Sequence, residues 1–157
     1  MRKIKIFLAS SIGELKLDRL AISEMTLELN DELIDQNIRL QLFMCEHFDT
    51  SIAMAGKQNE YNDFIRQPCD IFINLYYNKL GSYTLEEYQT ALNTRQKHGQ
   101  PQIYIFAKGE ALESSSEMQD LFLKAQANDV TVTHYKSLDE IADLYKQIVM
   151  SYISRQA

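Results

Sequence analysis

A glutamate follows a strongly apolar segment at a spacing that could place it beside a bound molecule. The run from Ile71 to Tyr77 is apolar enough for a buried strand, and Glu87 lies in the segment Leu80-Gly81-Ser82-Tyr83-Thr84-Leu85-Glu86-Glu87-Tyr88 that follows it. In an open α/β sheet, ligands bind outside the carboxyl ends of the strands, where the strand order reverses. A carboxylate on the opening turn of the next helix can face such a ligand. Glu87 is therefore the candidate catalytic residue.

The same segment also allows a structural explanation. Thr84-Leu85-Glu86-Glu87 fits the Thr-x-x-Glu capping box, in which the glutamate turns back to accept a hydrogen bond from the threonine backbone N–H. A catalytic carboxylate would instead point its oxygens into the crevice. Residue spacing alone leaves both roles open for Glu87. Neighbouring Glu86 is followed by another glutamate rather than by an apolar residue, so we expect it to be turned toward solvent.

Two consecutive serines follow the first apolar segment of the chain. Ser10 and Ser11 could donate hydrogen bonds to a ligand, or they could cap the next helix, whose free backbone N–H groups would favour an anion such as a pyrophosphate. Capping is a strong alternative because Ser11-Ile12-Gly13-Glu14 fits the Ser-x-x-Glu box. Two further segments fit the same box, Ser114 to Glu117 and Ser137 to Glu140.

Apolar, β-rich runs alternate with segments of helical period along the whole chain. The predicted strands are 3–9, 38–44, 70–77, 102–106 and 130–135, and the predicted helices are 12–33, 84–97, 117–127 and 138–154, with a short one around Tyr61, Phe64 and Ile65. Because each connection is a helical crossover, the strands should be parallel and the crossovers right-handed. This predicts an α/β, three-layer, doubly wound, flavodoxin-like domain with a five-stranded parallel sheet of order 2-1-3-4-5. Residues 9–11 and 78–83 should then flank one crevice.

The first predicted helix repeats apolar residues with acidic residues between them, as expected of an amphipathic helix that covers a sheet. The residues predicted to form its apolar face are Leu17, Leu20, Ile22, Met25, Leu29 and Leu33.

Composition restricts the classes of function. A chain of 157 residues with 45% apolar and 24% charged residues suits a single domain, 1–157, with a substantial core. A net charge of −6 disfavours binding to nucleic acid, because that binding depends on Lys and Arg neutralising phosphates. The apolar stretch near the N-terminus is too short for a secretory signal, and no run is long enough for a membrane span. We therefore expect a cytoplasmic protein with no nucleic-acid or membrane partner.

The cysteines and histidines indicate neither a disulfide framework nor a metal site. Cys45 and Cys69 lie beside predicted strands and are interpreted as reduced packing residues. His47, His98 and His134 are far apart and lack the spacing of metal ligands.

Three segments resemble a known family. Ile6-Phe7-Leu8-Ala9-Ser10-Ser11, Asp70-Ile71-Phe72-Ile73 and Gly81 to Tyr88 are similar to the Toll/interleukin-1 receptor (TIR) superfamily, and most similar to bacterial TIR-like domains of anti-phage and stress signalling. The loop from Asp49 to Gln58 and the following Glu60-Tyr61-Asn62 also resemble those bacterial domains. Enzymatic members have an aromatic residue, three further residues, and then a glutamate followed by an apolar residue. Tyr83, Glu87 and Tyr88 match that spacing.

The resemblance implies a NAD glycohydrolase (NADase) that cleaves the nicotinamide–ribose bond of NAD, which is a substrate here and not a cofactor. Breaking this glycosidic bond develops oxocarbenium character at the ribose carbon, and the Glu87 carboxylate could stabilise that charge or attack the carbon. Nicotinamide leaves as a neutral molecule from a positively charged ring. One carboxylate can therefore suffice where ordinary glycosidases need two.

Sequence position suggests the surroundings of Glu87. Tyr83 and Phe48 could stack on nicotinamide or adenine, Ser10 and Ser11 could contact ribose hydroxyls or phosphate oxygens, and Lys57 or Arg66 could neutralise phosphate charge. Structural alternatives are a loop anchor for Phe48, a cation near the helix end for Arg66 and an exposed surface position for Lys57. The further substrate-binding candidates are Asp49 and Tyr77. Family members often act only when assembled, so a homo-oligomer and a sensor domain or activator protein are implied partners.

Alternative functions remain at this stage. A TIR domain that serves only for self-association, as a scaffold, would have much the same sequence. Nucleoside deoxyribosyltransferases also use a glutamate, within Gly-x-x-x-Glu-x-Gly, but here Gly81 lies six positions before Glu87 and Gln89 occupies the place of the second glycine. The chain lacks the Gly-x-Gly-x-x-Gly turn of nicotinamide-dependent dehydrogenases.

Overall fold

Five parallel strands form one sheet in the computed structural model, which describes residues 1–11, 15–47, 69–77, 82–99, 101–109 and 116–155. The strands are β1 (Arg2–Ser11), β2 (Ile38–His47), β3 (Ile71–Tyr76), β4 (Gln102–Lys108) and β5 (Thr131–Tyr135). Their order is β2-β1-β3-β4-β5 and every neighbouring pair is parallel, which confirms the predicted topology. The order reverses between β1 and β3, so the expected ligand position is at their carboxyl ends.

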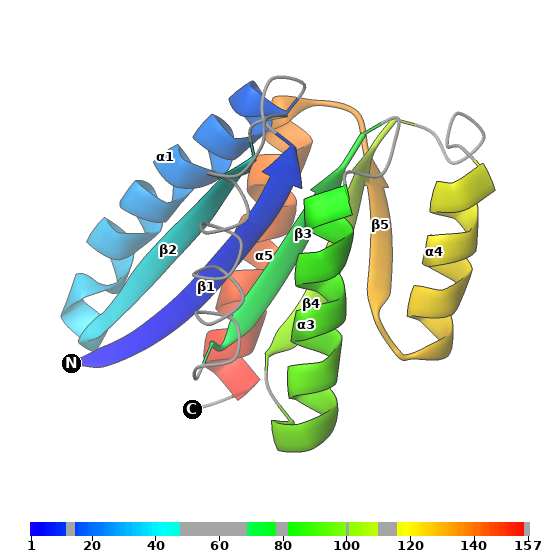
Figure 1. Cartoon of the computed structure of the whole chain (residues 1–157). Coiled ribbons are helices and arrows are strands. Elements are labelled where there is room, and N and C mark those ends of the chain that lie inside the picture. The colour runs from blue at the N-terminus through cyan, green and yellow to red at the C-terminus, as the bar shows by residue number, and fades with distance from the viewer. Residues whose placement is uncertain (12–14, 48–68, 78–81, 100, 110–115, 156–157) are drawn as a thin grey trace.

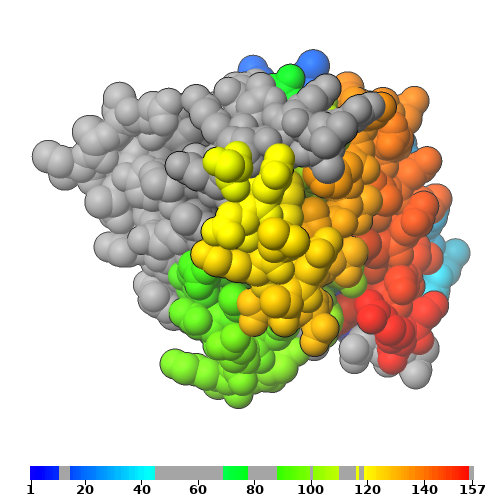
Figure 2. Space-filling model, turned by 90° about the vertical axis from the view of Figure 1, so that its right-hand side faces the viewer, coloured from blue at the N-terminus to red at the C-terminus, as the bar shows by residue number. Residues whose placement is uncertain are grey.

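Helices cover both faces of this sheet. The helices of the described ranges are α1 (Lys16–Leu33), α3 (Ser82–His98), α4 (Ser116–Ala127) and α5 (Leu138–Arg155), and a 3-10 turn, η1 (Ile34–Gln36), follows α1. Figure 1 shows α1 and α5 behind the sheet and α3 and α4 in front of it. Figure 2 looks onto the edge formed by β5 and shows α4 and α5 on either side of it. None of these described helices is both long and apolar enough to cross a membrane. The short helix predicted around Tyr61 lies outside the described residues.

The sheet separates two apolar clusters, because successive strand residues point to opposite faces. In β1, Ile4, Ile6 and Leu8 pack with α1 and α5, whereas Phe7 and Ala9 pack with α3 and α4. All six residues of β3 are buried, as expected for a central parallel strand covered on both faces. Figure 1 shows all four helices starting at the carboxyl edge of the sheet.

The apolar face of α1 differs from the prediction. Leu17 and Leu20 are 61% and 52% exposed, so their assignment to the core was wrong. Ile22, Leu29 and Leu33 are buried as predicted. Toward the start of the helix, Leu15, Asp18 and Arg19 are buried as well. The charged residues Asp18 and Arg19 interrupt the apolar pattern in the sequence, although both side chains are buried in the fold.

Helix starts also differ from the prediction in one case and agree in another. Ser11 is the last residue of β1, and Leu15 occupies the N-cap position of α1, so the predicted box from Ser11 to Glu14 does not stand at the start of this helix. At α5, the Glu140 backbone N–H donates to Ser137 Oγ at 3.1 Å. The predicted serine cap is therefore confirmed there.

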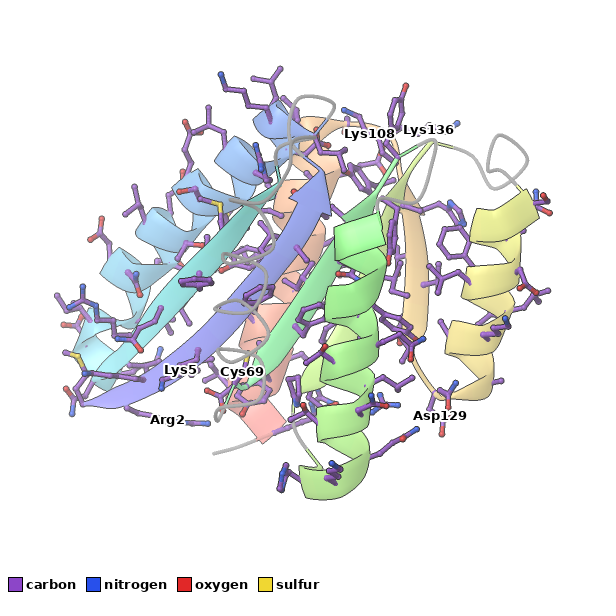
Figure 3. All side chains as sticks on the ribbon, in the orientation of Figure 1. Arg2, Lys5, Cys69, Lys108, Asp129 and Lys136 are labelled. Atoms are coloured by element: carbon purple, nitrogen blue, oxygen red, sulfur yellow. The ribbon has the colours of Figure 1, made fainter. Side chains whose placement is uncertain are left out.

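The amino edge of the sheet, opposite the carboxyl ends of the strands, is stabilised by Asp70. Its Oδ2 accepts a hydrogen bond from the Lys5 backbone N–H at 2.8 Å, and its Oδ1 accepts one from the Tyr152 hydroxyl at 2.9 Å. One carboxylate thus links β1, the start of β3 and α5. Figure 3 shows Lys5 at this edge and Lys108 at the opposite one.

Stability should fall at alkaline pH because two weakly acidic side chains, those of Cys69 and Tyr145, are buried in the core. Burial raises the pKa of the Cys69 thiol from 9.0 to about 12, with Asp70 acting in the same direction. Burial also raises the pKa of Tyr145 to about 12, although its hydrogen bond with Thr26 acts in the opposite direction. Above the unfolded pKa, the unfolded chain loses a proton that the folded chain keeps. Each group then lowers the free energy of unfolding by about 1.4 kcal/mol per pH unit.

Urea unfolding at neutral pH and at about pH 10.5 measures this effect. We expect the free energy of unfolding to stay constant up to about pH 9 and to fall steeply above it. Cys69 is a free, buried thiol. In Cys69→Ala the free energy of unfolding should therefore fall less steeply with pH, because one titrating proton has been removed. Equal stability at both pH values would contradict the assignment of raised pKa values.

Candidate functional site

Glu87 lies in the second turn of α3 and not in its opening turn. The helix begins at Ser82, so Thr84 is its third residue and Glu87 its sixth, and the first turn contains no acidic residue. Thr84 is therefore inside the helix rather than at its N-cap, which removes the capping-box explanation for Glu87. The side chains of Tyr83, Glu86 and Glu87 lie outside the described part of the structure.

The residue after Glu87 is buried against the sheet. Tyr88 is 1% exposed and packs in the apolar cluster between α3 and the strands, together with Ala91 and Leu92 of the same helix. Its hydroxyl has no hydrogen-bond partner among the residues that the structure describes. Burial raises the pKa of Tyr88, with nearby Arg95 opposing the shift, so the phenol stays protonated at neutral pH. A buried hydroxyl without a partner costs free energy that a polar ligand could recover.

A second polar side chain lies on the same face of the sheet. Asn74 is fully buried in β3, where it stands opposite Ala9 of β1. Its Nδ2 donates to the Tyr76 hydroxyl at 2.9 Å, but its Oδ1 has no partner within the described part of the chain. Asn74 Oδ1 and the Tyr88 hydroxyl therefore offer an acceptor and a donor on the face that α3 covers. Neither was predicted, although an asparagine within Ile71–Tyr76 is a visible exception in an apolar strand.

The two tyrosines at the end of β3 point to opposite faces, as strand alternation requires. Tyr76 packs in the cluster beneath α3, whereas Tyr77 packs against the cluster beneath α1 and α5. The sequence prediction chose Tyr77 as the substrate-binding residue. The structure does not bring Tyr77 together with Asn74 and Tyr88, and it places Tyr76 with them instead.

Ser10 lies on the other face of β1. Its side chain is fully buried, and the residue is paired in register with Leu75 of β3. In the described ranges, Ser10 Oγ has no hydrogen-bond partner. Ser11 is the last residue of β1 and pairs with His47, and its side chain lies outside the described part. The candidate residues Phe48, Asp49, Lys57 and Arg66 also lie outside the described residues.

A buried ion pair lies at the carboxyl ends of β4 and β5. Asp18 of α1 is fully buried; its Oδ1 is 3.1 Å from Lys108 Nζ and its Oδ2 accepts a hydrogen bond from the Tyr135 hydroxyl at 2.6 Å. Lys108 and Tyr135 are the last residues of their strands. Burial raises the pKa of Tyr135, and the hydrogen bond to the Asp18 carboxylate adds to the shift. Sequence reasoning missed this group.

Two hollows that described residues line lie elsewhere. One of about 530 Å³ lies beside the end of α1 and is lined by Met1, Leu27, Ile34 and Arg39 among others. Another, of about 340 Å³, lies along the second half of α3 and includes Thr90. Neither is at the carboxyl edge of β1 and β3. Within the described ranges, no group of three or more His, Cys, Asp or Glu side chains could bind a metal ion.

Solved structures share this fold at low sequence identity. The chain is similar to the CMP N-glycosidase BcmB of Clostridium botulinum, with 13% identity and a TM-score of 0.53 over 90% of this chain and 98% of that one. It is also similar to the flavodiiron core of a Synechocystis protein, with 11% identity and a TM-score of 0.54, over 97% of this chain and 36% of that one. An oxidised flavodoxin of Bacillus cereus matches with 11% identity and a TM-score of 0.48, over 96% of this chain and 97% of that one.

The similarity to the CMP N-glycosidase and to the flavodiiron core, with the observed sheet order, defines a flavodoxin-like α/β fold. No protein-family profile and no curated protein sequence matches the chain.

Proposed function

We propose that this protein is a cytoplasmic N-glycosidase that cleaves the nicotinamide–ribose bond of NAD, as a TIR-like NADase of bacterial defence. Glu87 is the proposed catalytic carboxylate. The observation that carries the proposal is the position of Glu87 in α3, directly after the central strand and next to Tyr88, whose buried hydroxyl has no partner. The resemblance of Gly81 to Tyr88 to the TIR superfamily and the fold shared with a CMP N-glycosidase support the same class of chemistry.

The proposed reaction transfers the ribose C1′ atom from nicotinamide to water. The C1′–N bond breaks, its electron pair neutralises the pyridinium ring, and nicotinamide departs uncharged. The Glu87 carboxylate stabilises the oxocarbenium character at C1′ or forms a transient bond to it. Water then supplies a hydroxyl group to C1′ and releases a proton, giving ADP-ribose. Asn74 Oδ1 and the Tyr88 hydroxyl supply hydrogen bonds to polar groups of the bound substrate.

A direct test is to incubate the purified protein with NAD and to measure free nicotinamide by chromatography. CMP is the matched comparison, since the fold is shared with a CMP N-glycosidase. Cytosine would depart as an anion unless it is protonated, so a site with one carboxylate should favour NAD. Release of nicotinamide without release of cytosine supports the proposal. Release of cytosine alone would replace it with a pyrimidine nucleotide N-glycosidase.

Activity is also proposed to depend on self-association, and a sensor domain or activator protein would promote it in the cell. We expect the specific activity to rise with protein concentration and with a crowding agent, because assembly is second order in protein. Light scattering on the same samples reports the assembly. Assembly without nicotinamide release at any concentration would favour the scaffold alternative.

A further inference from the structure

Helix α1 presents large apolar side chains to solvent at a regular interval. Leu20, Leu27 and Ile34 are 52%, 66% and 64% exposed, and each follows the last by seven residues. Ile34 belongs to η1, which directly continues the helix. Seven residues make nearly two helical turns, so these three side chains form an exposed stripe along one face. Single exposed leucines are ordinary, but three apolar residues at this interval are typical of a helix that pairs with another helix.

A hollow lies at the end of the exposed stripe. Its volume is about 530 Å³, and Leu27 and Ile34 line it together with Met1 and Ile38 among others. Met1 is 66% exposed, whereas Ile38, the first residue of β2, is buried. Figure 1 shows this end of α1 beside the start of β1. An apolar side chain of a partner can therefore enter between the end of α1 and the start of β2.

The charges beside the exposed stripe are acidic. The segment from Leu20 to Gln36 contains five acidic residues and no Lys or Arg. These acids, all exposed, are Glu24, Glu28, Asp31, Glu32 and Asp35. Glu32 lies 3.9 Å from Lys146 of α5, and Arg39 lines the hollow with Asp31. The remaining acids give the stripe a negative surroundings along its length.

Negative charge favours one kind of occupant over two others. A second copy docked symmetrically through the same stripe would place acids against acids. An anionic membrane surface would be repelled for the same reason. A helix that carries apolar residues at heptad spacing, with Lys or Arg beside them, matches both the spacing of the stripe and its charge.

We propose that the exposed stripe of α1, with the hollow at its end, is a docking surface for a basic amphipathic helix of a partner protein. Apolar side chains of that helix cover Leu20, Leu27 and Ile34, and one of them enters the hollow. Its Lys or Arg side chains lie against Glu24 and Glu28. Removal of the stripe from water supplies the affinity, and the charges select the partner.

The probe is a labelled peptide of 18 residues, the length of α1, with leucine at positions a and d of each heptad and lysine elsewhere. Fluorescence anisotropy at a tracer concentration of peptide measures its binding to the purified protein. One control peptide has glutamate in place of lysine, and another has the same composition in permuted order. We expect the first peptide to bind, more weakly at high salt, and both controls to bind about 10-fold more weakly or not at all.

Leu27→Gln combined with Ile34→Gln tests the apolar contacts. Both positions are exposed, so this double variant should unfold at the wild-type Tm. Its affinity for the lysine peptide should fall by about 10- to 100-fold, because less apolar surface is buried on binding. Leu123→Gln is the matched control, since Leu123 of α4 is 67% exposed and lies outside the stripe. It should bind the peptide with wild-type affinity.

Glu24→Gln combined with Glu28→Gln tests the charges. The affinity for the lysine peptide should fall by about 5- to 10-fold, and its dependence on salt should become shallower. Asp139→Asn combined with Glu140→Gln removes two exposed acids from the first turn of α5 and is the control. This control should bind the peptide like wild type.

Three results would overturn the inference: no binding by the wild type, equal binding of the lysine and glutamate peptides, or unchanged affinity in the Leu27 and Ile34 double variant. Sedimentation of the protein without peptide checks the second occupant. A wild-type dimer that the same double variant disperses would assign the stripe to a second copy instead. These measurements use no NAD, so their outcome is independent of the proposed glycosidase.

Discussion

Glu87→Gln is expected to lower the rate of nicotinamide release from NAD by about 1,000-fold, which corresponds to about 4 kcal/mol of lost transition-state stabilisation. Glutamine keeps the size of the side chain but removes the negative charge that opposes the developing positive charge at the ribose carbon. Because the charge develops only in the transition state, kcat should fall while the KM for NAD changes little. Single-turnover measurements at saturating NAD give this rate.

Glu86→Gln is the matched control for this prediction. It removes one negative charge from the same turn of α3, at a position rotated by about 100° around the helix axis. We expect Glu86→Gln to retain activity within a few-fold of wild type and both variants to unfold at similar temperatures. Glu87→Gln with wild-type activity, or equal losses in both variants, would reject Glu87 as the catalytic residue.

Asp18→Ala is expected to lower the free energy of unfolding by about 3 kcal/mol. The Asp18 carboxylate is fully buried between Lys108 and the Tyr135 hydroxyl, so its removal leaves a buried phenol and a partly buried ammonium without an acceptor. The Lys108 side chain is 26% exposed and can regain some hydration, which places the loss at the lower end of the range for broken buried pairs. Urea unfolding followed by circular dichroism measures it.

The chain contains an exposed ion pair that serves as the control. Asp120 Oδ2 and Lys124 Nζ are also 3.1 Å apart, but their side chains are 64% and 73% exposed. Asp120→Ala should therefore change the free energy of unfolding by less than about 0.5 kcal/mol. Similar losses in Asp18→Ala and Asp120→Ala would show that burial does not strengthen the Asp18 pair.

Local sequence patterns indicated some of the candidate site residues and not others. Glu87 was predicted because a glutamate after a buried strand is a local pattern, and Tyr77 at the end of β3 was predicted for the same reason; the roles of both stay predictions. The start of α3 was placed two residues late, and this error created the capping-box alternative for Glu87. Helix ends depend on one or two hydrogen bonds, so local patterns locate them poorly.

Periodic burial let the sequence by itself indicate the strands and the order of helices and strands along the chain. The sheet order β2-β1-β3-β4-β5 was predicted from the helical crossovers between these strands, and the structure confirms it. Residues that face a core recur every second position in a strand and about every 3.6 positions in a helix, so this information is local.

The tertiary structure alone decided which polar side chains meet. Asp18 contacts Lys108 and Tyr135 across 90 and 117 residues of sequence, and Arg19 is buried although its charge predicts exposure. Such contacts follow from which strand ends lie side by side in space. No spacing along the chain encodes that proximity.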